Sequence, residues 1–323
     1  MGGNALKNVK TRRYQKDEYH ELESKVLLLL KGAFPYERFE VPKSYTSKES
    51  FGDLDIVYTN QRHGYDLVGG VAALLGSKEL VRNGPYASMD YQEIQIDLIK
   101  ASPEWFDYGI QYFSHNDLGN LRGRIFHKFG MKHGHNGLFY KIRDPQRGDH
   151  VIHELLLTDD HTKALSFLEL EHVESFETLI DIYEHVIGCK YFNPSIYQFE
   201  NINAVARIRD KKRSTYTGFV KYIEGMNPEY YYQFDPKESY RDWVLDFFGK
   251  QAEYDRIMSD YNLLLERKKR FNGDLVRSTV LLDGKELGMF MQFLVPQMPD
   301  VLQMNQAGIV ELIRDKYAEY SIQ

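Results

Sequence analysis

The sequence predicts an α+β fold in the first half of the chain and an α-helical domain in the second half. Polar and apolar residues alternate over 53–57 and 93–99, which is the period of a β-strand. The segment 66–75 between them has apolar residues at helical spacing, so it is expected to be a crossover helix. From about residue 158 the apolar period becomes helical almost throughout.

Helix and turn signals predict the remaining elements of the first half. A run rich in Glu, Lys and Leu over 20–33 is expected to be a helix that ends near Gly32 and Pro35. A cap at 116–117 starts a second helix, which reaches about residue 129. The other expected elements are a basic arm over 1–19, a turn into a helix at 103–106 and a short strand over 138–142.

The second half is expected to consist of successive helices. A cap at 158–160 precedes an apolar stripe that begins at Leu165. The same pattern returns over 176–187, 204–223, 238–248, 252–269 and 309–320. We therefore divide the chain into a basic N-terminal arm over 1–19, an α+β domain over 20–157 and an α-helical domain over 158–323.

Composition limits the classes of protein that the chain can belong to. Of 323 residues, 42% are hydrophobic, which is ordinary for a globular protein. The single cysteine, Cys189, excludes an intramolecular disulfide and a cysteine-based zinc site. No apolar run approaches membrane-spanning length and no signal-peptide pattern is present, so we expect no membrane partner and a cytoplasmic or other reducing intracellular location.

Three aspartates form the most informative pattern in the sequence. Residues two apart on a strand project from the same face, so Asp53 and Asp55 point together while Leu54 and Ile56 face the core. Asp97 lies on the polar face of the second predicted strand. If the two strands are neighbours, three carboxylates meet in one small volume.

Crowded carboxylates favour divalent cations as their counter-charge. Carboxylate and water oxygens suit Mg²⁺, which completes its coordination with substrate phosphates. We expect two Mg²⁺ ions, with Mn²⁺ as a possible substitute, in a site for phosphoryl or nucleotidyl transfer. Gly52 directly before the first pair lets a bulky anion approach the backbone. The alternative is a metal-free Asp-x-Asp at the edge of a strand.

The order of the motifs resembles a known family of enzymes. Gly-Asp-x-Asp over 52–55 is followed by an aspartate in an apolar strand at 97, and then by Tyr-Phe-Ser-x-x-Asp-x-x-Asn over 112–120. This series resembles the palm and fingers of family X DNA polymerases, the polymerase β type of the nucleotidyltransferase superfamily, over about 40–143. The resemblance implies a palm with a mixed sheet.

The resemblance also implies roles for individual residues. Asp53, Asp55 and Asp97 fall on the metal-binding and catalytic triad. Tyr112 and Phe113 fall on the pair that lines the nucleotide sugar. Further matches are Asn120 on a minor-groove contact to the incoming base, Asp117 beside that base and Arg124 on a template-side arginine.

The chain departs from the family pattern at several positions. The Gly-Ser that holds the triphosphate in the family is not cleanly present over 41–48, where Ser44 and Lys48 could supply a donor and a positive charge. Gln95 replaces an arginine beside the third aspartate, and Leu121 replaces a cationic template contact. His-Asn at 115–116 stands where the family has Gly-Ser at a cis-bonded turn.

Basic clusters offer candidate contacts to nucleic acid despite the net charge of −6. Phosphate contacts from Lys and Arg dominate nucleic-acid affinity, although a basic cluster can equally be a solvated helix end. Clusters occur over 7–16, 207–213 and 267–270. The cluster followed by Tyr216 and Phe219 is the strongest candidate, and its members are Arg207, Arg209, Lys211, Lys212 and Arg213.

The predicted function is transfer of a nucleoside monophosphate from an NTP or dNTP to the 3′-hydroxyl of a nucleic acid, with release of pyrophosphate. One alternative is template-independent addition to RNA or tRNA 3′ ends. A second alternative is an inactive palm that serves as a nucleic-acid-binding module. The sequence leaves open the sugar and base preference, template dependence, a DNA or RNA acceptor, and the oligomeric state.

Overall fold

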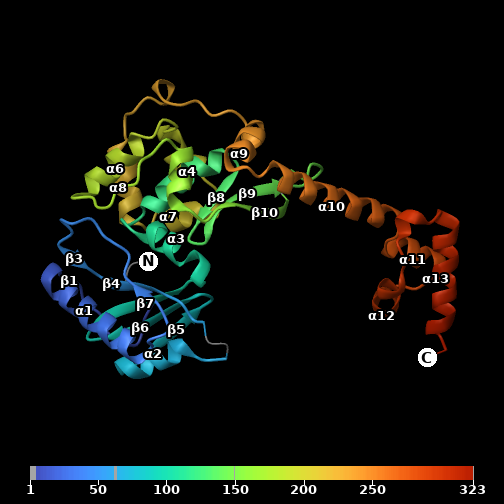
Figure 1. Cartoon of the computed structure of the whole chain (residues 1–323), viewed down its shortest axis with the longest axis horizontal. Helices are drawn as coiled ribbons and strands as arrows, with labels where there is room; N and C mark the ends of the chain where they lie inside the picture. The colour runs from blue at the N-terminus through green and yellow to red at the C-terminus, as the bar shows by residue number, and fades with distance from the viewer. Residues whose placement is uncertain (1–4, 62–63, 149, 323) are drawn as a thin grey trace. The chain divides into compact units, whose positions relative to one another are not determined.

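The chain was analysed as a computed structural model that describes residues 5–61, 64–148 and 150–322. It contains two compact units, residues 1–250 and 251–323 (Figure 1). The first unit combines sheets with helices and the second is helical, which gives the α+β class expected from the sequence. The division lies after Lys250 and not at residue 158, because the helices that follow the last strand pack on the earlier ones. The Tyr197 hydroxyl, for example, donates to the carbonyl of Leu121 at 3.2 Å.

The strands of the first unit form a five-stranded, a three-stranded and a two-stranded sheet. Their orders are β2-β4-β7-β6-β5, β10-β9-β8 and β1-β3. The strands are β1 Tyr14–Gln15, β2 Phe39–Glu40, β3 Ser50–Phe51, β4 Asp53–Tyr58, β5 Leu80–Asn83, β6 Tyr86–Tyr91, β7 Ile94–Lys100, β8 Met131–Gly134, β9 Gly137–Arg143 and β10 Val151–Thr158.

Helices surround these sheets in the first unit and make up the second. Those of the first unit are α1 Lys16–Ala33, α2 Leu67–Leu75, α3 Phe106–Phe113, α4 Leu118–Lys128, α5 His161–Phe167, α6 Leu179–Ile187, α7 Ala204–Asp210, α8 Ser214–Tyr222 and α9 Arg241–Phe248. Those of the second unit are α10 Gln251–Arg270, α11 Gly273–Val280, α12 Gly284–Leu294 and α13 Gln306–Tyr320.

The five-stranded sheet is mixed. β4 and β7 are parallel neighbours connected through α2, and Asp55 lies opposite Asp97 in their register. The other three pairings in this sheet are antiparallel. The pairing of β6 with β7 places Ser88 on the other side of Asp97. The expected adjacency of the two aspartate strands is therefore confirmed.

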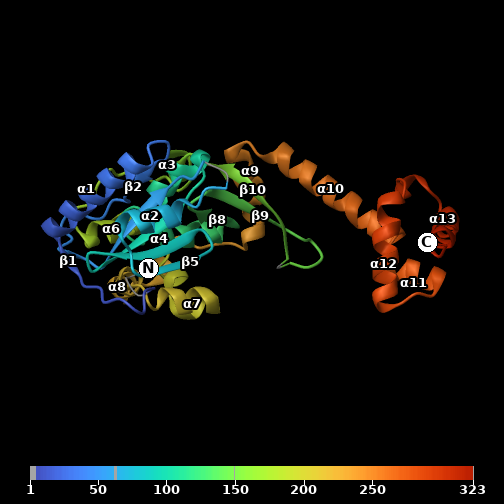
Figure 2. The ribbon, with the colours of Figure 1, turned by 90° about the horizontal axis from the view of Figure 1, so that it is seen from below.

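One face of the five-stranded sheet packs against α1 and α2 (Figures 1 and 2). The buried residues of α1 recur every three or four positions, as expected of an amphipathic helix, and are Tyr19, Leu22, Val26 and Leu30. They join a core with Leu54 and Ile56 of β4 and with Val71 of α2. Since side chains alternate along β4, the residues between these apolar ones face away from this core.

The N-terminal arm is more ordered than the sequence suggested. α1 begins at Lys16 instead of residue 20, and β1 pairs with β3 just before it. The carboxylate of Glu79 accepts hydrogen bonds from three consecutive backbone amides, those of Lys7, Asn8 and Val9. The amide of Ala5 donates to Oε1 of Gln95 at 2.9 Å. The arm is thus held to the sheet by backbone hydrogen bonds.

The structure also differs from the expected elements after residue 150. The eight-residue strand β10 pairs with β9, although no strand was expected there. The expected helix over 204–223 is broken at 211–213 into α7 and α8, with Asn203 capping α7 through a hydrogen bond to the amide of Ala206. The predicted cap at 158–160 is confirmed, because Asp160 accepts from the amides of Thr162 and Lys163.

The second unit has a hydrophobic core of its own. Its fully buried members come from α11, α12 and α13, and include Val276, Phe290, Leu294, Ile309 and Ile313. No residue of α10 is buried. Within the described part of the chain, no helix is both long enough and apolar enough to cross a membrane.

Candidate metal centre

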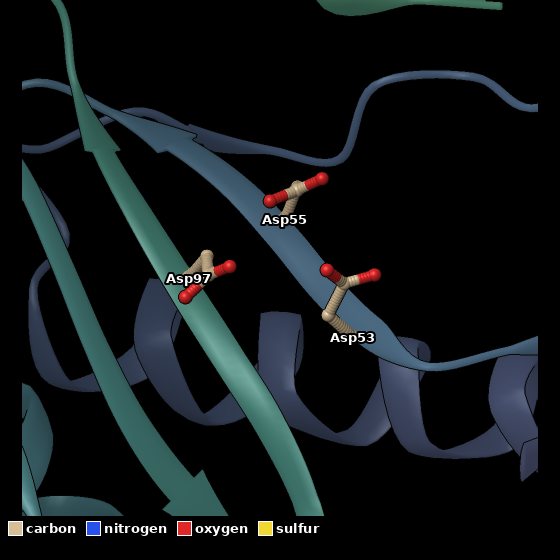
Figure 3. A group of neighbouring side chains, drawn as sticks. All are labelled: Asp53, Asp55 and Asp97. Atoms are coloured by element: carbon tan, nitrogen blue, oxygen red, sulfur yellow. The ribbon is translucent and has the colours of Figure 1, made fainter. Parts of the chain in front are cut away.

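The three predicted aspartates come together on the five-stranded sheet. Asp53, Asp55 and Asp97 each offer a carboxylate oxygen, and these oxygens lie within 4.8 Å of one another. Figure 3 shows the three carboxylates on one side of β4 and β7, with α1 passing behind the strands. In the described residues this is the one group of three or more His, Cys, Asp or Glu side chains that is close enough to share a metal ion.

The crowding is visible in the acid–base properties of the group. Burial, followed by the charges of Asp53 and Asp97, raises the pKa of Asp55 to about 7. Burial is also the largest cause that raises the pKa of Asp97, whose side chain is almost inaccessible to solvent. Three carboxylates so placed are destabilised when all are ionised, and a hard divalent cation with oxygen ligands would relieve that repulsion. The donor set fits Mg²⁺ or Mn²⁺.

Neighbouring polar groups fix the orientation of Asp97. Nε2 of Gln95 lies 2.9 Å from both carboxylate oxygens of Asp97, and the Ser88 hydroxyl donates to Oδ1 at 2.5 Å. The amide of Ala5 holds Oε1 of Gln95, which leaves its NH₂ group facing the carboxylate. Sequence analysis missed Ser88, although the alternation of buried Ala87 and Met89 around it could have placed it on the polar face.

Lys48 lies beside the aspartates, and the charge of a second cation, Arg13, acts on Lys48. The charges of Asp53 and Asp55 act on Lys48, but its burial outweighs them and lowers its pKa. Nζ of Lys48 is 3.3 Å from Oγ of Ser44, so the two residues predicted to bind the nucleotide are neighbours. The second cation, Arg13, was assigned to the basic arm and not to the site.

Gly52 is also close to a cation of the chain. A Cβ atom at this position would lie 3.0 Å from Nη1 of Arg13, so the glycine makes room for that guanidinium. Arg13 is held there by hydrogen bonds to Ser50, including one of 2.8 Å to its carbonyl oxygen. The backbone at Gly52 therefore lies against the guanidinium of Arg13.

The predicted sugar-binding pair lies on the same face of the sheet as the aspartates. Phe113 packs against a buried cluster that includes Val57 and Ile99, which follow Asp55 and Asp97 by two positions and therefore share their face. Tyr112 packs edge-on against Phe113, with ring centroids 5.3 Å apart.

Close packing of α3 on α4 positions this pair. A Cβ atom on Gly119 would lie 2.4 Å from the carbonyl oxygen of Tyr112, so α4 can approach only because a glycine stands there. The turn between the helices has two consecutive left-handed residues, His115 and Asn116, with φ of 60° and 61°. The described chain has no cis peptide bond, so this turn differs from the cis-bonded Gly-Ser turn of family X polymerases with which 115–116 was compared.

The residues predicted to contact the base and the template form hydrogen bonds and ion pairs within the chain. Asp117 forms an ion pair with Arg213, and Asn120 accepts a hydrogen bond of 2.8 Å from Arg209. Arg124 and Arg209 both form ion pairs with Asp210. Asp210 is fully buried, which opposes its ionisation, but the two guanidinium groups outweigh this effect and hold its pKa below the ordinary value.

Part of the basic cluster over 207–213 belongs to this network. Arg209 and Arg213 are engaged with carboxylates, and Nη2 of Arg207 donates to the carbonyl of Ile202. Lys211 and Lys212 are exposed, with Lys211 5.5 Å from the ring of Phe199. Tyr216 and Phe219 are fully buried, so they belong to the core and do not offer rings for stacking on bases. Asp210, the single acid among these arginines, is the centre of the network.

The chain matches no protein-family model, and no curated protein matches it either.

Proposed function

We propose that the protein is a metal-dependent nucleotidyltransferase that transfers a nucleoside monophosphate from a nucleoside triphosphate to the 3′-hydroxyl of a nucleic acid. The observation that carries this proposal is the convergence of three carboxylates from two parallel neighbouring strands within 4.8 Å. When bound there, a pair of Mg²⁺ ions supplies activation of an attacking hydroxyl and stabilisation of the leaving pyrophosphate.

The three aspartates have unequal surroundings that suit unequal roles. Asp53 and Asp55 are both partly exposed and lie on the same strand, so they would hold both ions. Asp97 is buried and oriented by Gln95 and Ser88, and would hold the ion next to the acceptor hydroxyl. Its raised pKa also suits it to accept the proton of that hydroxyl.

Cations and aromatic rings on either side of the aspartates suit a nucleoside triphosphate. Lys48, Ser44 and Arg13 provide donors and positive charge for the phosphates. Phe113 and Tyr112 provide apolar surface for the sugar on the same face of the sheet.

One observation favours untemplated addition as a second candidate. Asn120 and Arg124, which would read the base pair in a templated polymerase, are bound by Arg209 and Asp210. With those side chains engaged, the nucleotide would be selected without a template.

The test is a panel of extension reactions with each ribo- and deoxyribonucleotide, on a recessed primer–template and on single-stranded RNA. Products that follow the template support the first candidate, and untemplated tails support the second. Asp97→Asn should abolish turnover, while Asp107→Asn, an exposed carboxylate paired with Arg38, should keep it. Normal incorporation by Asp97→Asn would contradict the proposal.

A further inference from the structure

A second polar cluster lies outside the candidate metal centre and is centred on Arg122 of α4. This arginine is 3% exposed, and burial is the main cause that lowers its pKa to about 10. Its Nη2 donates to Nε2 of His185 at 2.7 Å, and its Nε has no hydrogen-bond partner. The guanidinium is therefore buried with its hydrogen-bonding capacity only partly used.

The charge of Arg122 is not balanced by the part of the chain that the structure describes. No carboxylate there forms an ion pair with it, and the groups that support its charge are Cys189 and Tyr108, which are neutral in their ordinary state. Arg124, two residues later in α4, is also largely buried, but its charge is balanced by an ion pair with Asp210. A buried charge without an opposite charge beside it is strongly destabilising, so a bound counter-ion would stabilise Arg122.

Other buried donors with unused capacity surround Arg122. The Tyr108 hydroxyl is buried without a partner, as are both ring nitrogens of His161 and Nδ1 of His115. Tyr108, His161 and His115 are 2%, 7% and 4% exposed. The ring of His161 lies 5.5 Å from that of Tyr108, and the charge of Arg122 acts on all three side chains.

The chemistry of this set favours an anion over a cation. Although imidazole nitrogens bind metals, those of the cluster do not converge closely enough to share an ion, and the guanidinium repels a cation. Guanidinium, phenol and imidazole N–H groups are all hydrogen-bond donors, and Arg in particular suits phosphate and carboxylate oxygens. Near-complete burial restricts the occupant to a small free ion.

We propose that the Arg122 cluster binds a small oxyanion of the inorganic phosphate type. Arg122 supplies the charge, and Tyr108 and His161 supply further hydrogen bonds. The inference is independent of nucleotidyl transfer, because neither the aspartates nor a nucleotide takes part in it.

The position of the cluster gives the anion a structural consequence. The amide of His115 donates to the carbonyl of Lys43 at 2.5 Å, and the ring of His115 packs against Phe176 at 4.9 Å. The carbonyl of Phe176 in turn accepts from the amide of Thr46 at 2.9 Å. The segment 43–48, which carries Lys48 toward the aspartates, is thus held by residues that line the anion site. Bound oxyanion should therefore order this segment.

Calorimetric titration of the full chain with inorganic phosphate tests the proposal, in EDTA and without Mg²⁺, with chloride at matched ionic strength as the reference ion. The unaltered chain should bind phosphate in preference to chloride. Arg122→Gln should lower the phosphate affinity by about tenfold or more, since it removes a charged donor. Lys221→Ala should leave phosphate binding unchanged, because Lys221 is an exposed lysine of α8 that belongs to neither the Arg122 cluster nor the candidate metal centre.

Tyr108→Phe keeps the experiment decisive if Arg122→Gln does not fold. It deletes a buried hydroxyl that has no partner in the chain, so stability in phosphate-free buffer should be unchanged or higher. Phosphate affinity should nevertheless fall by about fivefold. The proposal is overturned if the unaltered chain does not bind phosphate, if Tyr108→Phe binds it equally well, or if Lys221→Ala binds it as weakly as Arg122→Gln.

Discussion

Replacing Asp55 by asparagine should stabilise the metal-free protein and remove its response to Mg²⁺. In the absence of metal, burial and two neighbouring carboxylates raise the pKa of Asp55 to about 7. The ionised form is therefore disfavoured in the folded state, and stability falls as the pH rises from about 4 to about 7. Asparagine keeps the shape of the side chain without its charge.

The size of the effect follows from the pKa. A rise from about 3.9 to about 7 corresponds to about 4 kcal/mol at a pH well above 7. Asparagine still buries a polar group and Asp55 is partly exposed, so we expect a gain of about 1–2 kcal/mol. For a unit of this size that gain raises the unfolding midpoint by about 3–6 °C.

Tryptophan fluorescence during thermal unfolding can measure this change. Both tryptophans, Trp105 and Trp243, lie in the first compact unit, so the signal reports on the unit that holds the aspartates. At pH 8 in EDTA, Asp55→Asn should unfold at a higher temperature than the unaltered chain. In Mg²⁺ the order should reverse, because only the unaltered chain gains from the metal.

Asp107→Asn is the matched control, since it removes an exposed carboxylate of the same unit. It should show the same response to Mg²⁺ as the unaltered chain. A lower midpoint for Asp55→Asn in EDTA, or an equal gain from Mg²⁺ in both proteins, would refute the account of repulsion relieved by metal.

Three further predictions follow from the groups around the site. Gln95→Leu removes the amide that orients Asp97 and should weaken Mg²⁺ binding about tenfold by calorimetry; unchanged affinity would show that the orientation does not matter. Asp210→Asn leaves Arg124 and Arg209 without their carboxylate and should cost about 3–5 kcal/mol in urea unfolding, whereas a loss below about 1 kcal/mol would contradict a buried ion pair. Burial lowers the pKa of His161 to about 3, so the folded state binds fewer protons than the unfolded chain and stability in phosphate-free buffer should fall as the pH drops below about 6.5. His161→Gln should reduce this slope by about 1.4 kcal/mol per pH unit, and an unchanged slope would contradict the assignment.

The sequence was most informative where a local period and a buried face agreed. Alternation over 53–57 and 94–99 placed Asp53, Asp55 and Asp97 on polar faces, and the crossover helix between them made parallel pairing the simple choice. Adjacency of the strands, and not any single motif, created the candidate metal centre.

Long-range hydrogen bonds and ion pairs were beyond the reach of local patterns. The short strands β1 and β3 exist through pairing with each other, and the arm is held by Glu79 from a distant part of the chain. Asp210 looked like an isolated acid among basic residues until folding placed it against Arg124 of α4. Arg122 carried no signal in the sequence, because its unusual property is burial without a carboxylate partner, which only the folded chain shows.

The most direct test of the central claim is to count Mn²⁺ ions bound to the aspartates by electron paramagnetic resonance, with a non-hydrolysable nucleoside triphosphate present. The account predicts that about two ions bind to the unaltered chain and to Asp107→Asn, and that Asp97→Asn loses at least one of them. Equal numbers of bound ions in Asp97→Asn and the unaltered chain would contradict it.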